Sequence, residues 1–216
     1  MRIAPEQAEV AGPVGPIEII VEAPAQPKGI ALVGHPHPLF GGANTNKVAQ
    51  TLARTLAGLG YVALRPNFRG VGGTAGTHDE GRGETEDMLA VLTWAQSRFG
   101  TPGEPLPVVL SGFSFGAFVQ ARVASRLKEA GTPARRLVLV GTAAGHVEGA
   151  RSYATDAVAA DTIVIHGAAD ETVPLANVLA WAEPMDLPVV VVAGADHFFH
   201  RRLHVLKDII QRAWRD

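Results

Sequence analysis

The pentapeptide Gly112-Phe113-Ser114-Phe115-Gly116 places a serine between two glycines, directly after the apolar run 107–110 and directly before a stretch of helical period. A strand, a sharp turn on the serine and then a helix form the context of a nucleophile elbow. The glycines leave room for the tight turn, and the strained serine lifts its hydroxyl clear of the sheet edge. The backbone N–H of Phe115 points to where an ester oxygen would become an anion. The segment predicts nucleophilic attack by Ser114 on an ester carbonyl.

A serine hydroxyl is protonated at neutral pH, so a nucleophilic serine needs a base. Two polar residues downstream each follow a short β-branched run, Asp170 and then His197. The chain order Ser, Asp, His is the order expected after a nucleophile elbow. We expect His197 to move the serine proton and Asp170 to orient the imidazole and stabilise its charged form. Asp196 competes for the orienting role, but a sequence neighbour's side chain usually points away from the ring it would have to hold.

A second oxyanion donor is expected in the loop that follows the predicted strand ending at Gly34. Pro36 and Pro38 have no N–H, so the donor is the backbone of His37 or of Leu39. Phenylalanines flank the same region, and Phe40 and Phe198 are the candidates for the walls of a substrate pocket.

The elements that would position these residues alternate between short β-branched runs and longer stretches of helical period. This alternation predicts an α/β fold, a mostly parallel sheet of about seven strands with helices on both faces and no cap domain. The predicted strands are 17–21, 29–34, 61–65, 107–110, 137–140, 162–166 and 189–192, and the predicted helices are 46–59, 84–99, 115–130, 175–181 and 201–214. The longest stretch without a clear element, 145–161, holds at most one helix, so we expect a shallow site open from above.

Composition narrows the class of protein. The chain of 216 residues, 47% of them hydrophobic, is long enough for one well-buried core, so 1–216 is expected to form a single domain. The formal net charge of −2 comes with no basic run, which argues against a nucleic-acid or membrane partner. There is no cysteine, which excludes disulfides and thiolate metal sites. Acidic residues and prolines near the start argue against a secretory leader and favour a cytoplasmic protein.

Two other kinds of site have weaker support. The segment 70–75 fits the dinucleotide pattern G-x-G-x-x-A, but the pattern must open a helix and polar loop residues follow it. The eight histidines include His200 and His204, spaced one helical turn apart, but carboxylate ligands at matching spacing are missing. We therefore expect no metal site and no cofactor.

The whole set of motifs resembles the α/β-hydrolase superfamily, and within it the small, lidless bacterial serine hydrolases of carboxylesterase type. The shared segments are 35–42, 67–72, 112–116, His166-Gly167 with Asp170, and 196–199. The resemblance favours His37 over Leu39 as the second oxyanion donor. It implies cleavage of small-molecule carboxylic esters of small to medium acyl chain through an acyl-enzyme intermediate. The alternatives are a thioesterase or peptidase with the same triad and a catalytically idle hydrolase fold that serves as a binding protein. Oligomeric state stays open.

Overall fold

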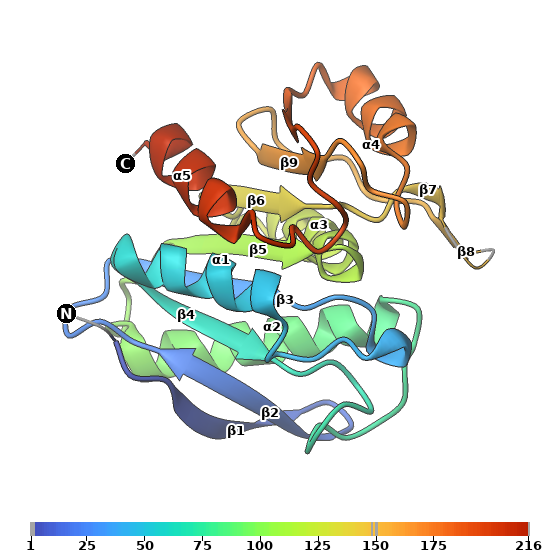
Figure 1. Ribbon diagram of the computed structural model, residues 1–216. Helices are drawn as coiled ribbons and strands as arrows, with labels where there is room; N and C mark the ends of the chain where they lie inside the picture. Colours follow the sequence, from blue (N-terminus) through green and yellow to red (C-terminus); the bar gives the residue numbers. More distant parts are fainter. Residues whose placement is uncertain (1–2, 148, 150, 216) are drawn as a thin grey trace.

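The computed structural model describes residues 3–147, 149 and 151–215 and contains a twisted sheet with helices on both faces (Figure 1). The strands run in the spatial order β1-β2-β4-β3-β5-β6-β9-β10. At one edge β1 pairs antiparallel with β2, and β2 pairs antiparallel with β4. The other five neighbouring pairs are parallel. The strand bounds are β1 Glu6–Gly12, β2 Gly15–Glu22, β3 Gly29–Gly34, β4 Tyr61–Pro66, β5 Val108–Phe113, β6 Arg136–Val140, β9 Ile163–Gly167 and β10 Val189–Val192.

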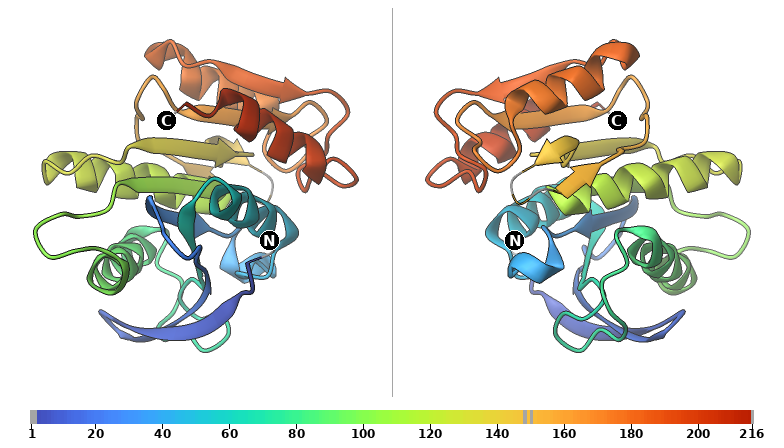
Figure 2. Two further views of the ribbon diagram at one scale, coloured as in Figure 1. Left: turned by 90° about the vertical axis from the view of Figure 1, so that its left-hand side faces the viewer. Right: turned by 90° about the vertical axis from the view of Figure 1, so that its right-hand side faces the viewer.

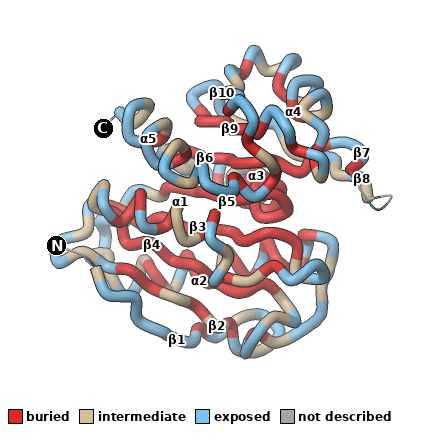
Figure 3. The backbone as a smooth tube through the Cα atoms, in the orientation of Figure 1, coloured by how far each residue is buried: buried red, intermediate tan, exposed pale blue. Residues whose placement is uncertain are grey.

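Helices α1 (Lys47–Gly58) and α5 (Leu203–Ala213) pack together on one face of the sheet, and α2 (Arg82–Phe99) and α3 (Phe115–Glu129) cover the other face (Figure 2). The central strands are buried on both sides, as Figure 3 shows, because each face has its own apolar cluster. Helix α4 (Leu175–Ala182) packs on β9 near the sheet's other edge. Two short 3₁₀ helices complete the set, η1 (Pro38–Phe40) and η2 (Glu183–Met185).

The predicted fold class is confirmed, with one strand more in the main sheet than expected. The additional strand is β1, in which only Val10 of seven residues is buried, so it carries little hydrophobic alternation. The described residues of the segment 145–161 form a small antiparallel hairpin and no helix, with β7 Gly145–Val147 paired to β8 Arg151–Tyr153. Within the part of the chain described, no helix is long and apolar enough to cross a membrane.

His35 ties two loops together at the end of the sheet where the parallel strands finish. Its Nε2 accepts a hydrogen bond from the Phe68 N–H at 2.9 Å, and its Nδ1 donates to the Pro36 carbonyl at 2.7 Å. The ring is fully buried, and this burial lowers the pKa of His35 to about 4, with a further lowering by the nearby His37. The imidazole is therefore neutral in the folded protein at neutral pH.

We expect the free energy of unfolding to fall as the pH is lowered from about 6.5 toward 4. In this window the unfolded chain binds a proton at His35 and the folded protein does not, so stability increases with pH. The shift of the His35 pKa corresponds to about 3 kcal/mol across the window. Urea unfolding at a series of pH values measures the slope, and His35→Gln should reduce it. The exposed His200→Gln variant is the control. An unchanged slope in His35→Gln would assign the pH dependence to other groups.

Candidate active site

The predicted elbow is present between β5 and α3. Ser114 has φ 56° and ψ −119°, a conformation outside the usual regions for a residue with a side chain. A Cβ on Gly112 would come closer than 3.0 Å to backbone atoms of Gly116, and one on Gly116 closer than 3.0 Å to the carbonyl oxygens of Gly34 and His35. The N-terminus of α3 therefore packs backbone against backbone on the end of β3, and both glycines are required by space.

Gly116→Ala should lower the free energy of unfolding by about 2–4 kcal/mol, because its Cβ meets backbone atoms that cannot rotate away. Denaturant midpoints measure the effect. The matched control is Gly58→Ala at the exposed end of α1, where an added Cβ has no neighbour within 4 Å. There alanine should stabilise by about 0.5–1 kcal/mol. Equal midpoints for Gly116→Ala and the wild type would contradict the packing argument.

Ser114, His197 and Asp170 come together although they lie on three different loops. His197 Nε2 is 3.0 Å from Ser114 Oγ, and His197 Nδ1 is 2.7 Å from Asp170 Oδ2. The three residues follow β5, β10 and β9 at the carboxyl ends of the parallel strands, where open α/β sheets place ligands. All three residues are buried, with 5 to 8% of their surface exposed. The arrangement can pass a proton from the serine hydroxyl to the imidazole while a carboxylate holds the ring.

The Asp170 carboxylate is fixed by its own loop. Its Oδ1 accepts the N–H groups of Thr172 at 3.0 Å and Val173 at 2.8 Å, which leaves Oδ2 for His197. His166, fully buried and 3.4 Å from Oδ2, bonds to the Val173 carbonyl, and burial lowers its pKa. The competing acid, Asp196, faces away and bonds to the His200 ring at 2.6 Å. The geometry therefore favours Asp170 over Asp196 as the partner of His197.

The loop after β3 presents the candidate oxyanion donors. The Leu39 N–H donates to His37 Nδ1 at 3.3 Å, so it already has a partner. Among the described residues, the His37 N–H has no backbone acceptor. Phe115 is the first residue of α3, where a helical N–H has no partner within the helix. The His37 and Phe115 rings are in contact, with centroids 4.9 Å apart, so the two residues lie side by side.

A cavity of about 1050 Å³ opens beside His37 and Phe115. Its lining residues are His37, Leu39, Phe40, His78, Glu80, Arg82, Thr85, Glu86, Phe115, Phe118, Arg122, Arg126, Arg151, Ser152, Tyr153 and Ala154. Phe40, one of the two residues expected to wall a substrate pocket, is among these lining residues. Phe198 does not line this cavity, because it lies against the other side of the site, on the rings of Phe113 and His197. The volume is at the upper end of the range usual for ligand pockets, about 300–1000 Å³.

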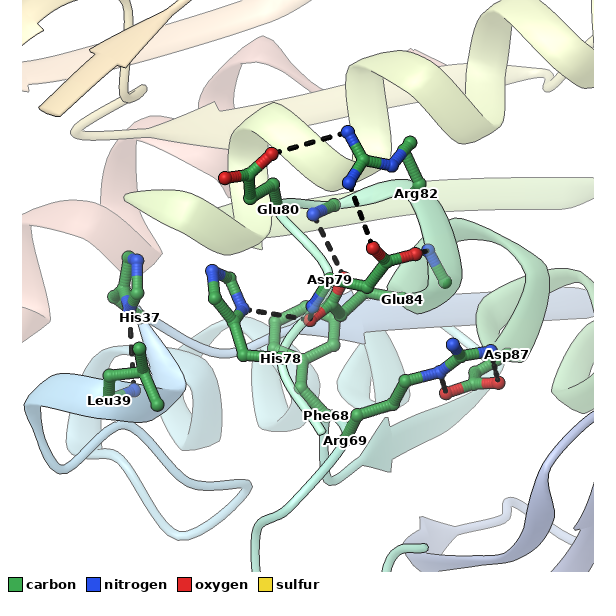
Figure 4. A network of polar contacts seen from close by, with 12 residues as sticks. His37, Leu39, Phe68, Arg69, His78, Asp79, Glu80, Arg82, Glu84 and Asp87 are labelled. Atoms are coloured by element: carbon green, nitrogen blue, oxygen red, sulfur yellow. Dashed lines mark hydrogen bonds and ion pairs between the residues drawn. The ribbon is translucent and has the colours of Figure 1, made fainter. Parts of the chain in front are cut away.

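One side of the cavity, built by the loop before α2, was not predicted from the sequence. The His78 ring points at Glu84 with Nδ1 2.8 Å from the carboxylate (Figure 4). Glu84, fully buried, also accepts the N–H groups of Asp79 and Gly81, both at 2.9 Å. One buried carboxylate therefore shapes the loop and holds His78 against His37 and Phe115. The sequence Gly-x-Gly-Glu at 81–84 could have indicated the start of this helix, because a glutamate three residues after the N-cap often accepts the backbone N–H of the cap residue.

The segment 70–75 is a loop, and the next helix, α2, starts only at Arg82, so the dinucleotide pattern does not open a helix. Helix α5 begins at Leu203, so His200 precedes it and does not lie one helical turn before His204, and the His200 ring is bonded to Asp196. Neither segment therefore has the helical placement that the alternative interpretation assumed.

The family model described as X-Pro dipeptidyl-peptidase (S15 family) matches residues 19–136. A lidless α/β serine hydrolase from Xanthomonas campestris is 34% identical, over 97% of this chain and 93% of that chain, with a TM-score of 0.82. An α/β serine hydrolase homologue from Coxiella burnetii is 35% identical over 97% of both chains, also with a TM-score of 0.82.

Among curated proteins, one from Rickettsia prowazekii is 43% identical over 119 residues. This match covers 55% of the chain and about half, 49%, of that relative. Fold, elbow and sequence thus agree with the resemblance noted above. The chain belongs to the α/β-hydrolase superfamily, among its lidless serine hydrolases, and to the family described as X-Pro dipeptidyl-peptidase (S15 family).

Proposed function

We propose that this protein is a serine hydrolase that cleaves small-molecule carboxylic esters of small to medium acyl chain. The observation that carries the proposal is the hydrogen-bonded series from Ser114 through His197 to Asp170, with lengths of 3.0 and 2.7 Å. A series of this kind activates a serine hydroxyl as a nucleophile. The strained backbone of Ser114 adds to the argument, because strain at a non-glycine residue clusters at active sites.

The reaction proceeds in two halves. His197 Nε2 takes the Ser114 proton as Oγ bonds to the ester carbonyl carbon, and the carbonyl oxygen becomes an anion held by the Phe115 and His37 N–H groups. When this oxygen re-forms its double bond, the alcohol leaves with the proton from His197. Water then attacks the acyl group on Ser114 and gives a proton to His197. His197 passes this proton to Ser114 Oγ as the bond between Oγ and the acyl carbon breaks, and the acid is released. Asp170 stabilises the imidazolium at both stages.

A peptidase is the second candidate, because the matching family model is described by an X-Pro dipeptidyl activity. The same triad cleaves amides when the leaving amine is well placed for protonation. A thioesterase would use the same groups as well.

A substrate panel tests the proposal. Rates with 4-nitrophenyl esters of two to sixteen carbons, an acyl thioester and an Ala-Pro 4-nitroanilide should show the highest kcat/KM for esters of short to medium chain. Each methylene adds about 0.8 kcal/mol of binding only while the cavity still has apolar wall to cover it. Higher kcat/KM for the anilide would move the assignment to a peptidase. No turnover of any member, with the protein folded, would favour a binding protein.

A further inference from the structure

The lining of the cavity beside the candidate oxyanion donors includes four arginines and two glutamates. The arginines are Arg82, Arg122, Arg126 and Arg151, and the glutamates are Glu80 and Glu86. A wall with more cations than anions attracts a ligand of negative charge. Whether any cation remains for a ligand depends on how these six groups pair with one another.

Both carboxylates of the lining are already paired. Arg82 lies between Asp79 and Glu80, at 3.0 and 3.2 Å, as Figure 4 shows. Arg126 bonds to Glu86 at 2.6 Å. Arg82 and Arg126 are therefore already paired with carboxylates, and Arg122 remains to be considered as a cation for a ligand.

Arg122 is different from the other arginines of α3 and its neighbours. Its guanidinium lies over the Phe118 ring, 4.7 Å from the centroid. Among the described residues no carboxylate lies within 4.0 Å of it. A planar guanidinium stacked on an aromatic ring keeps its edge available for two parallel hydrogen bonds to a carboxylate or a phosphate.

His37, which also lines the cavity, adds no charge to it at neutral pH. The pKa of His37 is lowered to about 4, first by burial and then by the charges of His78 and Arg151. His37 is thus neutral at neutral pH, and its Nδ1 accepts the Leu39 N–H. His37 therefore contributes no charge to the cavity, and Arg122 is a cation in its wall.

The position of Arg122 relative to the nucleophile sets the size of the ligand. Phe115, Phe118 and Arg122 are spaced three and four residues apart, so they lie on one face of α3. Seven residues separate Phe115 from Arg122, which is roughly 10 Å along the helix axis. The wall between them is apolar, because the Phe118 ring packs on Phe115 at 5.8 Å and on Tyr153 at 5.1 Å.

The cavity lies on the acyl side of the site. His197 must give its proton to the leaving oxygen, so the alcohol part of an ester lies near His197 Nε2. The cavity is lined by His37 and Phe115, the proposed donors to the carbonyl oxygen, and it lies beside Ser114 without including Ser114 or His197. Phe198, which contacts the His197 ring, is not in the lining either, so the cavity extends away from the His197 side. The acyl chain is the part of the ester that would extend along α3 toward Arg122.

We propose that the preferred substrates are esters whose acyl chain ends in an anionic oxygen group, a carboxylate or a phosphate, which Arg122 binds. This inference rests on the proposed esterase function and names its substrate class. Three bonds of an extended chain span about 3.6 Å, so a chain of about eight bonds spans the roughly 10 Å that separate Phe115 from Arg122 along the helix. Methyl-terminated chains of equal length would fill the apolar wall but leave Arg122 without a partner.

Three 4-nitrophenyl esters of equal length test the proposal: the octanoate, the hydrogen suberate and the analogue that ends in a phosphonate. The wild type should show kcat/KM at least about tenfold higher for an anionic ester than for the octanoate, because hydrogen bonds to charged groups are strong. Arg122→Gln should abolish this ratio, and Arg122→Lys should restore part of it. The ratio should also fall with added salt. The better of the two anionic esters identifies the group that the site takes.

Lys128→Gln is the matched control, because it removes one positive charge from α3 outside the cavity. It should keep the wild-type ratio. Octanoate cleavage that depends on Ser114, without preference for either anionic ester, would overturn the inference and leave the esterase function intact. If no ester is cleaved, calorimetry with the Ser114→Ala protein decides the inference alone. Equal Kd values for octanoate and hydrogen suberate would refute it, and tighter suberate binding lost in Ser114→Ala/Arg122→Gln would support it.

Discussion

Ser114→Ala should lower ester turnover by at least about ten thousandfold, because alanine has no oxygen to form the acyl-enzyme. A fluorophosphonate probe should label the wild-type protein at Ser114 and leave the variant unlabelled. Peptide mass spectrometry locates the label, and a progress curve with 4-nitrophenyl butyrate gives the rate. The denaturant midpoint should stay near the wild-type value, since the change removes one hydroxyl from the end of a hydrogen-bonded series.

Ser125→Ala is the control for that experiment, because Ser125 lies on α3 without a strained backbone or a neighbouring base. It should retain wild-type labelling and turnover. A label found at Ser111 or Ser125 would overturn the assignment of the nucleophile.

Asp170→Asn should lower kcat by about ten thousandfold while the fold is retained. The asparagine can keep the Oδ1 contacts to Thr172 and Val173, but its amide nitrogen would face His197 Nδ1 in place of an acceptor. The imidazole then loses the partner that sets its tautomer and stabilises its charged form. Steady-state kinetics on a saturating ester gives kcat directly.

Asp196→Asn provides the sharpest comparison, because it removes the charge of the residue next to His197 in sequence. Asp196 bonds to His200, so kcat should stay within a few-fold of the wild type. A large loss in Asp196→Asn with a small loss in Asp170→Asn would reverse the assignment of the two acids.

The sequence predicted best those features that local patterns specify. The buried strand β3 matches its predicted bounds of 29–34, because six apolar or glycine residues in succession suit a strand covered on both faces. The chain order of Ser114, Asp170 and His197 required only that three loops meet at one sheet edge, which a parallel sheet ensures. Asp196 could be set aside by the same reasoning, from the direction in which neighbouring side chains point.

Features that depend on contacts across the fold could not be read from the sequence. Strand β1 exposes most of its residues and forms because β2 offers an edge for seven paired residues. The hairpin β7–β8 has three-residue strands, too short for a period to appear. Phe40 and Phe198 look equivalent beside the motif, but only the folded chain shows that Phe198 lies on the far side of His197. Arg122 reads in sequence as an ordinary solvated residue of a helix.

The backbone contact between Gly116 and the end of β3 locks the serine turn to the loop of His37, so neither can move without the other. The outer wall of the cavity comes from different parts of the chain, namely η1, β8 and the outward face of α3. The triad and the outward-facing residues of this wall are thus different residues, although α3 contributes to both. Exchange of exposed residues on η1 and β8 should change the shape of the cavity while the serine turn remains in register, which makes this small scaffold a favourable starting point for changing specificity.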